Sequence, residues 1–211
     1  MDNKAESYDV MLHLGDAVDG DGHKESTFHL TTDIDIQQEM AIKVIESANA
    51  KTHKFVSGTP YHCGTTLDYD KAVARHFGDE ISWMRKIDIE GVKINMAHTV
   101  GKSTTPVGGD IALKKQRIWN YIYAQIENDA PADLILRGHI HEYLENGDTR
   151  MRMRTVPALK IGNPDFDRYA RKMQGGFYDV GFIELDIDNG KIKRLEPITG
   201  EFRSAKGYEA I

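Results

Sequence analysis

Short apolar strands alternate with helical stretches along this chain, and this alternation restricts the possible folds more than any other feature. Between the strands, apolar residues recur every three or four positions in stretches 36–48 and 110–127, as on one face of a helix. The apolar runs that predict buried strands are residues 8–14, 54–57, 92–98 and 132–138. Strands that alternate with helices of this length predict an α/β layered fold.

Shorter segments complete the predicted order of elements. Residues 58–66 are rich in Gly, Thr and Pro and predict a loop, and a helix is expected to begin near Asp68. The last third, 151–194, predicts strands and turns. The chain has no internal repeat, and its 211 residues fit one domain, 1–211, long enough to bury a continuous core.

The composition excludes several classes of protein. Apolar residues make up 40% of the chain and charged residues 28%, as in globular proteins rather than disordered or collagen-like ones. The net charge of −6 argues against a basic surface for non-specific nucleic-acid binding. No apolar run approaches the roughly 18 residues that span a membrane, the first residues predict no signal peptide, and the single cysteine, Cys63, suits a reducing compartment. We therefore expect a cytoplasmic protein with no membrane partner.

Each predicted strand is followed by a side chain that can bind a metal or transfer a proton. Asp16, His62 and His98 follow or end the first three strands, and His139 and His141 follow the fourth. In open α/β sheets, ligands bind at the carboxyl ends of the strands. We therefore expect these residues to meet at one edge of the fold, with nitrogen and oxygen ligands for any metal.

Two short motifs carry most of this expectation. In Gly15–Gly20 (Gly-Asp-Ala-Val-Asp-Gly), a carboxylate at a glycine-framed strand end can reach two cations, although its Asp residues can equally cap backbone N–H groups in a turn. In Gly138–His141 (Gly-His-Ile-His), positions i and i+2 of an extended chain share a face, which predicts that both histidines point the same way. The alternative is a pair of surface histidines.

Two further histidines, His98 and His62, indicate a functional site only when they are considered together with the other candidate residues. His98 alone would more often be a satisfied structural group than a ligand. His62 lies in the Gly/Pro-shaped loop, where it is a candidate proton donor because an unperturbed imidazole titrates near neutral pH. The alternative is an ordinary loop histidine.

Taken together, the order Gly-Asp-x-x-Asp, Gly-Thr-x-x-His, Ala-His and Gly-His-x-His resembles the calcineurin-like metallophosphoesterase family. The phage-encoded branch is the most similar, because there too the first motif continues into Asp-Gly-x-Gly-His and a Thr-Thr-Asp segment, here Thr31–Asp33. The resemblance spans about residues 8–185. For a phage-encoded protein, the expected location is the host cytoplasm.

The resemblance implies a four-layer α/β/β/α sandwich that hydrolyses phosphate esters with one or two divalent metals, such as Mn, Fe, Ni or Zn. It implies that Asp16 bridges both metals and that His98 and His139 bind the second one. Thr59, in the place of the family's Asn, would be a weaker neutral ligand of that metal, and His141 would bind the first. The substrate could be a phosphomonoester or a phosphodiester, nucleic acid included.

The resemblance also implies roles for two residues beside the metals. His62 would protonate the leaving oxygen or stabilise the transition state, with direct ligation as an alternative. Asp19 would hold its loop and orient a neighbouring group. Nothing in the sequence identifies residues that bind the remainder of the substrate.

One departure from the family pattern concerns the first strand. The family begins with a strand ending in Asp-x-His, which supplies two ligands to the first metal, and the fifteen residues before Asp16 contain no such motif. We therefore expect an N-terminally incomplete domain, most simply the larger fragment of a split enzyme that needs a complementing chain. Alternatives are a truncated chain, exchange between identical chains in a homo-oligomer, and a degenerate, non-catalytic metal-binding subunit with a partner.

Several other residues are expected to be structural. Cys63 is expected to be a packed small residue rather than a nucleophile. Arg137 and Lys102 are expected to be solvated charges, with phosphate contact as the alternative. The residues expected to be core or rim aromatics are Trp83, Trp119, Tyr121 and Tyr123.

Overall fold

A computed structural model describes residues 7–21, 30–101, 110–160 and 179–200 of the chain. Its helices are α1 (Ile34–Ser47), α2 (Pro60–Cys63), α3 (Asp68–His76) and α4 (Ile111–Glu127). Its strands are β1 (Tyr8–His13), β2 (Ala50–Phe55), β3 (Met84–Ile89), β4 (Val92–Ala97), β5 (Leu134–Arg137), β6 (Leu144–Gly147), β7 (Arg152–Thr155), β8 (Val180–Asp188) and β9 (Lys191–Gly200). No helix within these ranges is long and apolar enough to cross a membrane.

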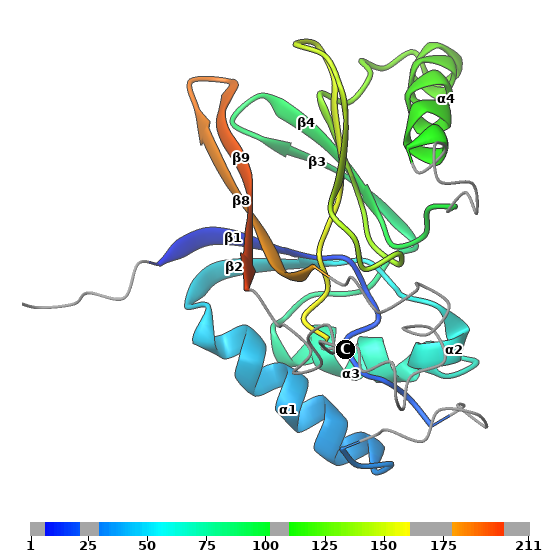
Figure 1. Cartoon of the computed structure of the whole chain (residues 1–211), viewed down its shortest axis with the longest axis vertical. Helices are drawn as coiled ribbons and strands as arrows, with labels where there is room; N and C mark the ends of the chain where they lie inside the picture. The colour runs from blue at the N-terminus through cyan, green and yellow to red at the C-terminus, as the bar shows by residue number, and fades with distance from the viewer. Residues whose placement is uncertain (1–6, 22–29, 102–109, 161–178, 201–211) are drawn as a thin grey trace, which may run out of the picture.

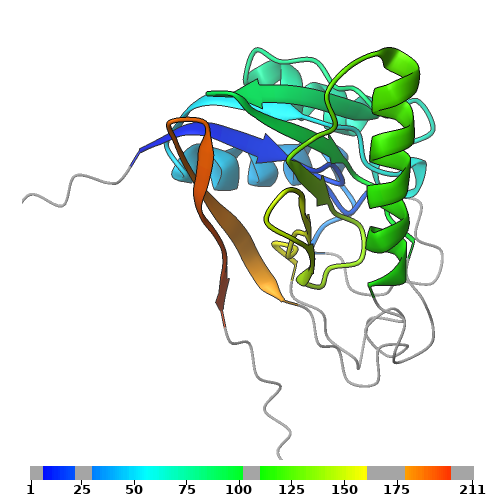
Figure 2. The same cartoon turned by 90° about the horizontal axis from the view of Figure 1, so that it is seen from above.

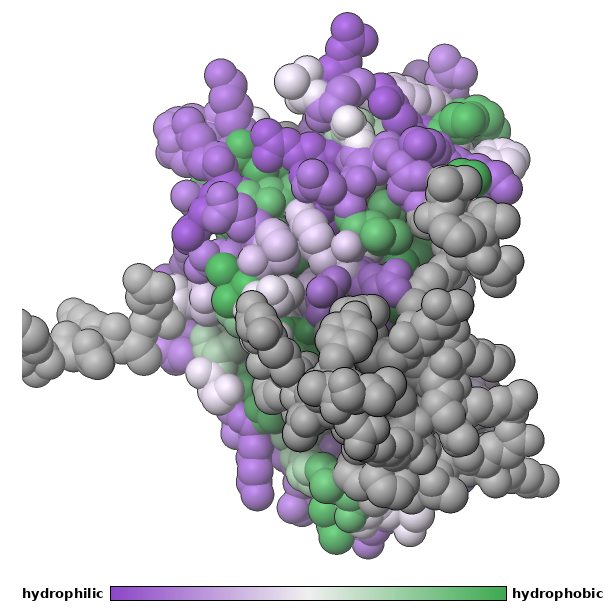
Figure 3. Space-filling model, in the orientation of Figure 1, coloured by the Kyte–Doolittle hydropathy of each residue, from purple (hydrophilic) through white to green (hydrophobic). Residues whose placement is uncertain are grey.

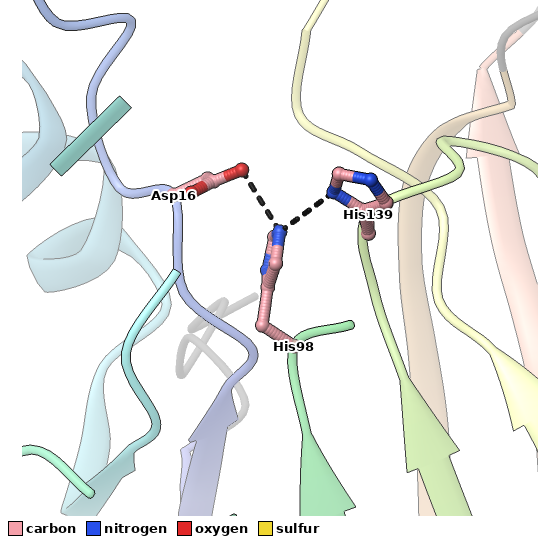
Figure 4. Close-up of side chains that lie close together, drawn as sticks. All are labelled: Asp16, His98 and His139. Carbon is pink, nitrogen blue, oxygen red and sulfur yellow. Dashed lines mark hydrogen bonds and ion pairs between the residues drawn. The ribbon is translucent and has the colours of Figure 1, made fainter. Parts of the chain in front are cut away.

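The strands form three hydrogen-bonded groups (Figure 1). β1 and β2 pair in parallel, and β8 and β9 form an antiparallel hairpin. The largest group is a mixed five-stranded sheet of order β3-β4-β5-β7-β6, in which β4, β5 and β7 run parallel and the edge strands β3 and β6 are antiparallel to their neighbours. The parallel strands β1, β4 and β5 all end towards the same region of the molecule (Figure 4).

Three apolar clusters hold these elements together as layers. α1 and α3 pack on one face of the β1–β2 pair through Ile45, Phe55 and Val73. The central cluster lies between strand layers and joins residues from β4, β5 and β9 with partly buried residues of β1 and β8. α4 packs on the other face of the five-stranded sheet, where Leu113 meets Ile135. The order of helix, strand, strand and helix layers confirms the predicted α/β/β/α sandwich (Figure 2).

Local sequence signals explain where the longer helices begin and end. The Asp33 side chain accepts hydrogen bonds from the backbone N–H groups of Asp35 and Ile36, which would otherwise have no partner in the first turn of α1. At the C-terminal end of α4, the longest helix among the described residues, Asn128 adopts a left-handed conformation with φ of 53°, which commonly ends a helix.

Some predicted boundaries are wrong. The strand predicted at 54–57 lies earlier, as β2 from Ala50 to Phe55. The loop predicted at 58–66 contains the short helix α2, which begins at Pro60. Within the predicted strand region 151–194, the structure has β7, β8 and the start of β9, while 161–178 falls outside the described residues. The helix expected near Asp68 is confirmed as α3.

The central cluster should carry much of the stability. Ile94 on β4 is 1% exposed, so Ile94→Ala leaves a cavity and should lower the free energy of unfolding by about 2–4 kcal/mol. The control is Ile118→Ala on α4, where 61% of the residue is exposed and the expected change is within about 0.5 kcal/mol. Urea denaturation of both variants measures the difference, and equal losses would show that the core lies elsewhere.

Candidate metal centre

Asp16, His98 and His139 come together where β1, β4 and β5 end (Figure 4). One ligand atom from each residue lies within 4.8 Å of the other two. β4 and β5 are parallel neighbours, and the backbone N–H of Gly138 donates to the carbonyl of His98 at 2.9 Å. This pairing places the two histidines side by side, as the strand-end argument predicts.

The ring of His98 is held from behind by the backbone. Its Nδ1 lies 2.5 Å from the carbonyl oxygen of Leu14, and a carbonyl can only accept, so Nδ1 carries a hydrogen. Nε2 therefore faces the cluster, 2.9 Å from Asp16 Oδ2 and 3.2 Å from His139 Nδ1. Ligands of one cation at about 2.1 Å lie roughly 3.0–3.4 Å apart, so these separations fit a shared metal ion.

The carboxylate of Asp16 is oriented by the loop after β2. Its Oδ1 accepts the backbone N–H of Thr59 at 2.6 Å and the Thr59 hydroxyl at 3.2 Å, which leaves Oδ2 directed at His98. Burial opposes ionisation, yet the hydrogen bond and charge of His98, with contributions from His62 and Thr59, hold the pKa of Asp16 at about 2. The carboxyl group of Asp16 is therefore ionised at neutral pH.

The pKa values of the two histidines, His98 and His139, are shifted in opposite directions. Burial opposes protonation of His98, but the hydrogen bond and charge of Asp16 outweigh it and raise the pKa of His98 above its ordinary value. For His139, burial and the neighbouring charge of His98 lower the pKa. A carboxylate, one imidazole that shares its proton with that carboxylate and one neutral imidazole form a donor set that suits a divalent transition metal.

The loops after β1 and β2 touch backbone to backbone. Gly15 has φ of 79°, and Asp16 follows it with φ of 54°. A Cβ on Gly58 would lie 1.9 Å from Asp16 Oδ1, and a Cβ on Gly15 would lie 2.4 Å from the Gly58 nitrogen. Glycine is required at both positions because any side chain would push the loops apart.

Asp70 joins these two loops, and sequence reasoning missed it. This α3 residue is 2% exposed. Its carboxylate accepts the backbone N–H groups of Asp16 at 3.1 Å, Ala17 at 3.0 Å and Gly58 at 2.8 Å. In the sequence, Asp70 is one of two acidic residues in the first turn of a helix, a position usually explained by the helix dipole.

His62 lies beside the cluster, on α2. Its Nδ1 is 2.8 Å from the carbonyl oxygen of Asp19, and its Nε2 is 3.9 Å from Asp16 Oδ2. The Asp19 side chain pairs with Lys160 at 2.6 Å. The loop that holds Asp19 thus fixes the ring of His62 with Nε2 directed towards the cluster.

The predicted alternation of His139 and His141 along a strand is wrong. β5 ends at Arg137, and the two histidines have φ of 73° and 57°, so neither is extended. His141 lies outside the group formed by Asp16, His98 and His139. Burial and the charge of Lys160 lower the pKa of His141 to about 4. Its role as a ligand of another metal stays a prediction.

Of two residues expected to be structural, the expectation is confirmed for Cys63 and wrong for Arg137. Cys63 is fully buried, and burial and the charges of Asp70 and Asp16 raise its pKa, so it is a packed residue as expected. Arg137 is 4% exposed, and the expectation of a solvated charge is therefore wrong. Lys102 lies outside the described residues.

The geometry makes the contacts of Asp70 testable. In Asp70→Asn, one oxygen remains to accept three backbone N–H groups and an amide NH₂ is brought against them. We expect a loss of about 2–4 kcal/mol in the free energy of unfolding, and weaker Mn²⁺ binding by calorimetry. Asp68→Asn changes the same charge on the same helix at an exposed site and should unfold at the parent's denaturant concentration. Equal behaviour of the two variants would contradict this role.

No protein-family model matches the chain, and no curated protein matches it. Among solved structures, a Streptococcus pneumoniae protein described as a predicted phosphoesterase is 12% identical over 90% of this chain and 88% of its own, with a TM-score of 0.46. Entamoeba histolytica Vps29 complexed with zinc is 16% identical over 90% of this chain and 98% of its own, with a TM-score of 0.41. An archaeal phosphodiesterase is 15% identical over 71% and 73%, with a TM-score of 0.36.

Proposed function

We propose that this protein is a metal-dependent phosphoesterase whose metal centre is formed by Asp16, His98 and His139. The observation that carries the proposal is the convergence of one carboxylate and two imidazoles from three strand ends, with ligand atoms within 4.8 Å of one another. His62 adds a proton-transfer group whose Nε2 is 3.9 Å from Asp16 Oδ2. A metal ligand set next to a histidine is the combination that hydrolysis of a phosphate ester needs.

The proposed ligand residues would bind the metal ion and fix its position in the site. When bound, a divalent metal supplies charge to neutralise phosphoryl oxygens and lowers the pKa of a water molecule. Asp16 contributes a carboxylate that stays ionised because its pKa is about 2. The Leu14 carbonyl fixes the tautomer of His98 so that Nε2 is its ligand atom. Mixed nitrogen and oxygen donors suit Mn²⁺, Fe, Ni²⁺ or Zn²⁺.

His62 is proposed to hold the proton that the leaving oxygen takes up. The Asp19 carbonyl binds Nδ1, so the ring presents Nε2 to the site. In the imidazolium form, Nε2 carries the transferable proton. Asp19 is in turn held by Lys160, which makes the pair a positioning device for His62. The Thr59 hydroxyl lies close enough to Asp16 to act as a weak further ligand.

The substrate is proposed to be a small phosphomonoester or phosphodiester. The net charge of −6 repels long duplex nucleic acid electrostatically. A short or single phosphodiester meets far less of that repulsion, because it brings only one or a few negative charges to the metal centre.

Hydrolysis of bis-p-nitrophenyl phosphate with Mn²⁺ tests the function. The parent should turn over, and chelation should abolish the activity. His139→Gln removes an imidazole ligand and should weaken Mn²⁺ binding by about tenfold or more and turnover by about a hundredfold. His76→Gln makes the same change on α3, where His76 pairs with Glu46, and should match the parent. Unchanged turnover and Mn²⁺ affinity in His139→Gln would contradict the proposal.

We further propose that the centre is completed by a complementing chain, which makes this protein the larger part of a split enzyme. Among the described residues, β1 pairs only with β2, and β8 pairs with β9 and, at its first residue Val180, with Ala158. The Tyr8 hydroxyl reaches Glu184 of β8 at 3.3 Å. Strand edges that face one another without pairing can accept an added strand. Three protein ligands also leave room for more at the metal centre.

An added apolar strand peptide ending in Asp-x-His tests this complementation. The expected result is association and a rise in turnover of about tenfold or more, because the peptide supplies both a paired edge and ligands. Tight association without turnover would favour the second candidate function, a non-catalytic metal-binding subunit with a partner. Absence of association, measured by calorimetry, would contradict complementation and leave the metal-binding proposal to its own test.

A further inference from the structure

A cavity of about 640 Å³ lies between α4 and the five-stranded sheet, and none of Asp16, His98 and His139 lines it. Its lining comes from β3, β4, β5 and α4, and in both views α4 stands beside the sheet on the side opposite β8 and β9 (Figures 1 and 2). Sites for small molecules typically have volumes of a few hundred to a thousand Å³. This cavity therefore has the size of a ligand site, and the proposed phosphoesterase chemistry does not use it.

A buried cation lines the cavity. Arg137 at the end of β5 is 4% exposed and donates hydrogen bonds to the carbonyls of Asn95 at 3.1 Å and Leu136 at 2.8 Å, and to Gln116 Oε1 at 2.9 Å. All three acceptors are neutral. A guanidinium keeps its charge at neutral pH even in a protein interior.

The other charges that line the cavity are paired. Lys86 of β3 pairs with Glu127 of α4, and Lys93 lies 3.9 Å from both Asp88 and Asp129. Within the described part of the chain, Arg137 is the one cation of the lining for which no ion pair is found. A buried positive charge without a counterion favours binding of an anionic group.

Asn95 provides a second polar group of the cavity, and one of its atoms lacks a hydrogen-bond partner. It lies on β4, is 8% exposed, and its Nδ2 donates weakly to the sulfur of Met84 at 3.5 Å. Its Oδ1 is buried and has no hydrogen-bond partner among the described residues. Because buried acceptors are nearly always satisfied in native proteins, a ligand that donates a hydrogen bond here would complete the site.

Aromatic side chains form part of the cavity wall. Trp119 stacks on Tyr123 of the same helix, with ring centroids 5.6 Å apart, and Trp83 lies next to β3 with 72% of its surface exposed. At the upper right of Figure 3, where Figure 1 places α4, a few hydrophobic residues lie among hydrophilic ones. Exposed aromatic rings beside a cavity suit a flat apolar ligand.

We propose that this cavity binds a small aromatic anion. The flat apolar body lies against Trp83 and Trp119, the negative group is bound by Arg137, and a hydrogen-bond donor of the ligand meets Asn95 Oδ1. The recognised chemistry is an aromatic ring system with a single carboxylate, sulfonate or similar anionic group. The buried polar groups favour such a small molecule over a protein partner, which could cover the exposed rings but would not place a charge on Arg137.

Two fluorescent probes that share the same aromatic ring system distinguish the contribution of the anionic group from that of the rings. 8-Anilinonaphthalene-1-sulfonate carries a sulfonate and an N–H donor, and N-phenyl-1-naphthylamine lacks only the sulfonate. Both tryptophans of the chain line the cavity, so energy transfer from tryptophan to the probe measures binding, and the variants below locate the site. The full-length parent should bind the sulfonate about tenfold or more tightly than the neutral probe.

Arg137→Met should weaken binding of the sulfonate by about tenfold and change binding of the neutral probe by less than about twofold. The control, Arg117→Met, removes an arginine of α4 that pairs with Asp148 and does not line the cavity, and it should leave both affinities unchanged. Equal affinities of the parent for the two probes, or equal losses in the two arginine variants, would overturn the proposal.

A second variant, at the rim of the cavity, tests the assignment even if Arg137→Met does not fold. Trp119 is half-exposed, so Trp119→Ala should fold. It should weaken binding of both probes by about fivefold, because a wall of the site is removed, with the affinities measured by energy transfer from the remaining Trp83. Unchanged affinity for both probes would show that they bind elsewhere and would overturn the assignment of the cavity.

Discussion

The carboxylate of Asp70 is the contact on which the proposed metal centre depends. It accepts three backbone N–H groups from the two loops that follow β1 and β2, and it does so in the protein interior. Because the loops meet at Gly15 and Gly58, small displacements would separate Asp16 from Thr59 and from His98. A buried carboxylate with several backbone donors is stable in one geometry only, and that geometry positions Asp16.

The electrostatics of the centre follow from this placement. Asp16 and His98 stabilise each other's charged forms across 2.9 Å, which lowers the pKa of the carboxyl and raises that of the imidazole. A divalent cation can take the place of the shared proton, because it satisfies the same two lone pairs and adds His139 as a third donor. The two side chains that form the ion pair, Asp16 and His98, are therefore also placed to bind one cation together.

General rules for α/β folds predicted a layered fold and the convergence of strand-end residues from the sequence. The four-layer order was implied by the resemblance to metallophosphoesterases. The sequence could not predict the left-handed conformations of His139 and His141, which depend on how β5 ends against its neighbours. It missed Asp70 and misjudged Arg137, since the burial of a charged side chain is decided by elements distant in sequence. The same tertiary packing leaves the cavity beside α4, which no periodicity in the chain reveals.

The central claim is that three side chains bind one metal ion. Anomalous diffraction from crystals of this protein grown with Mn²⁺ tests it most directly. The account predicts a strong anomalous peak within about 2.0–2.4 Å of Asp16 Oδ2, His98 Nε2 and His139 Nδ1. A well-ordered crystal at saturating Mn²⁺ with no peak between these atoms, or with Mn²⁺ bound only at other residues, would contradict it.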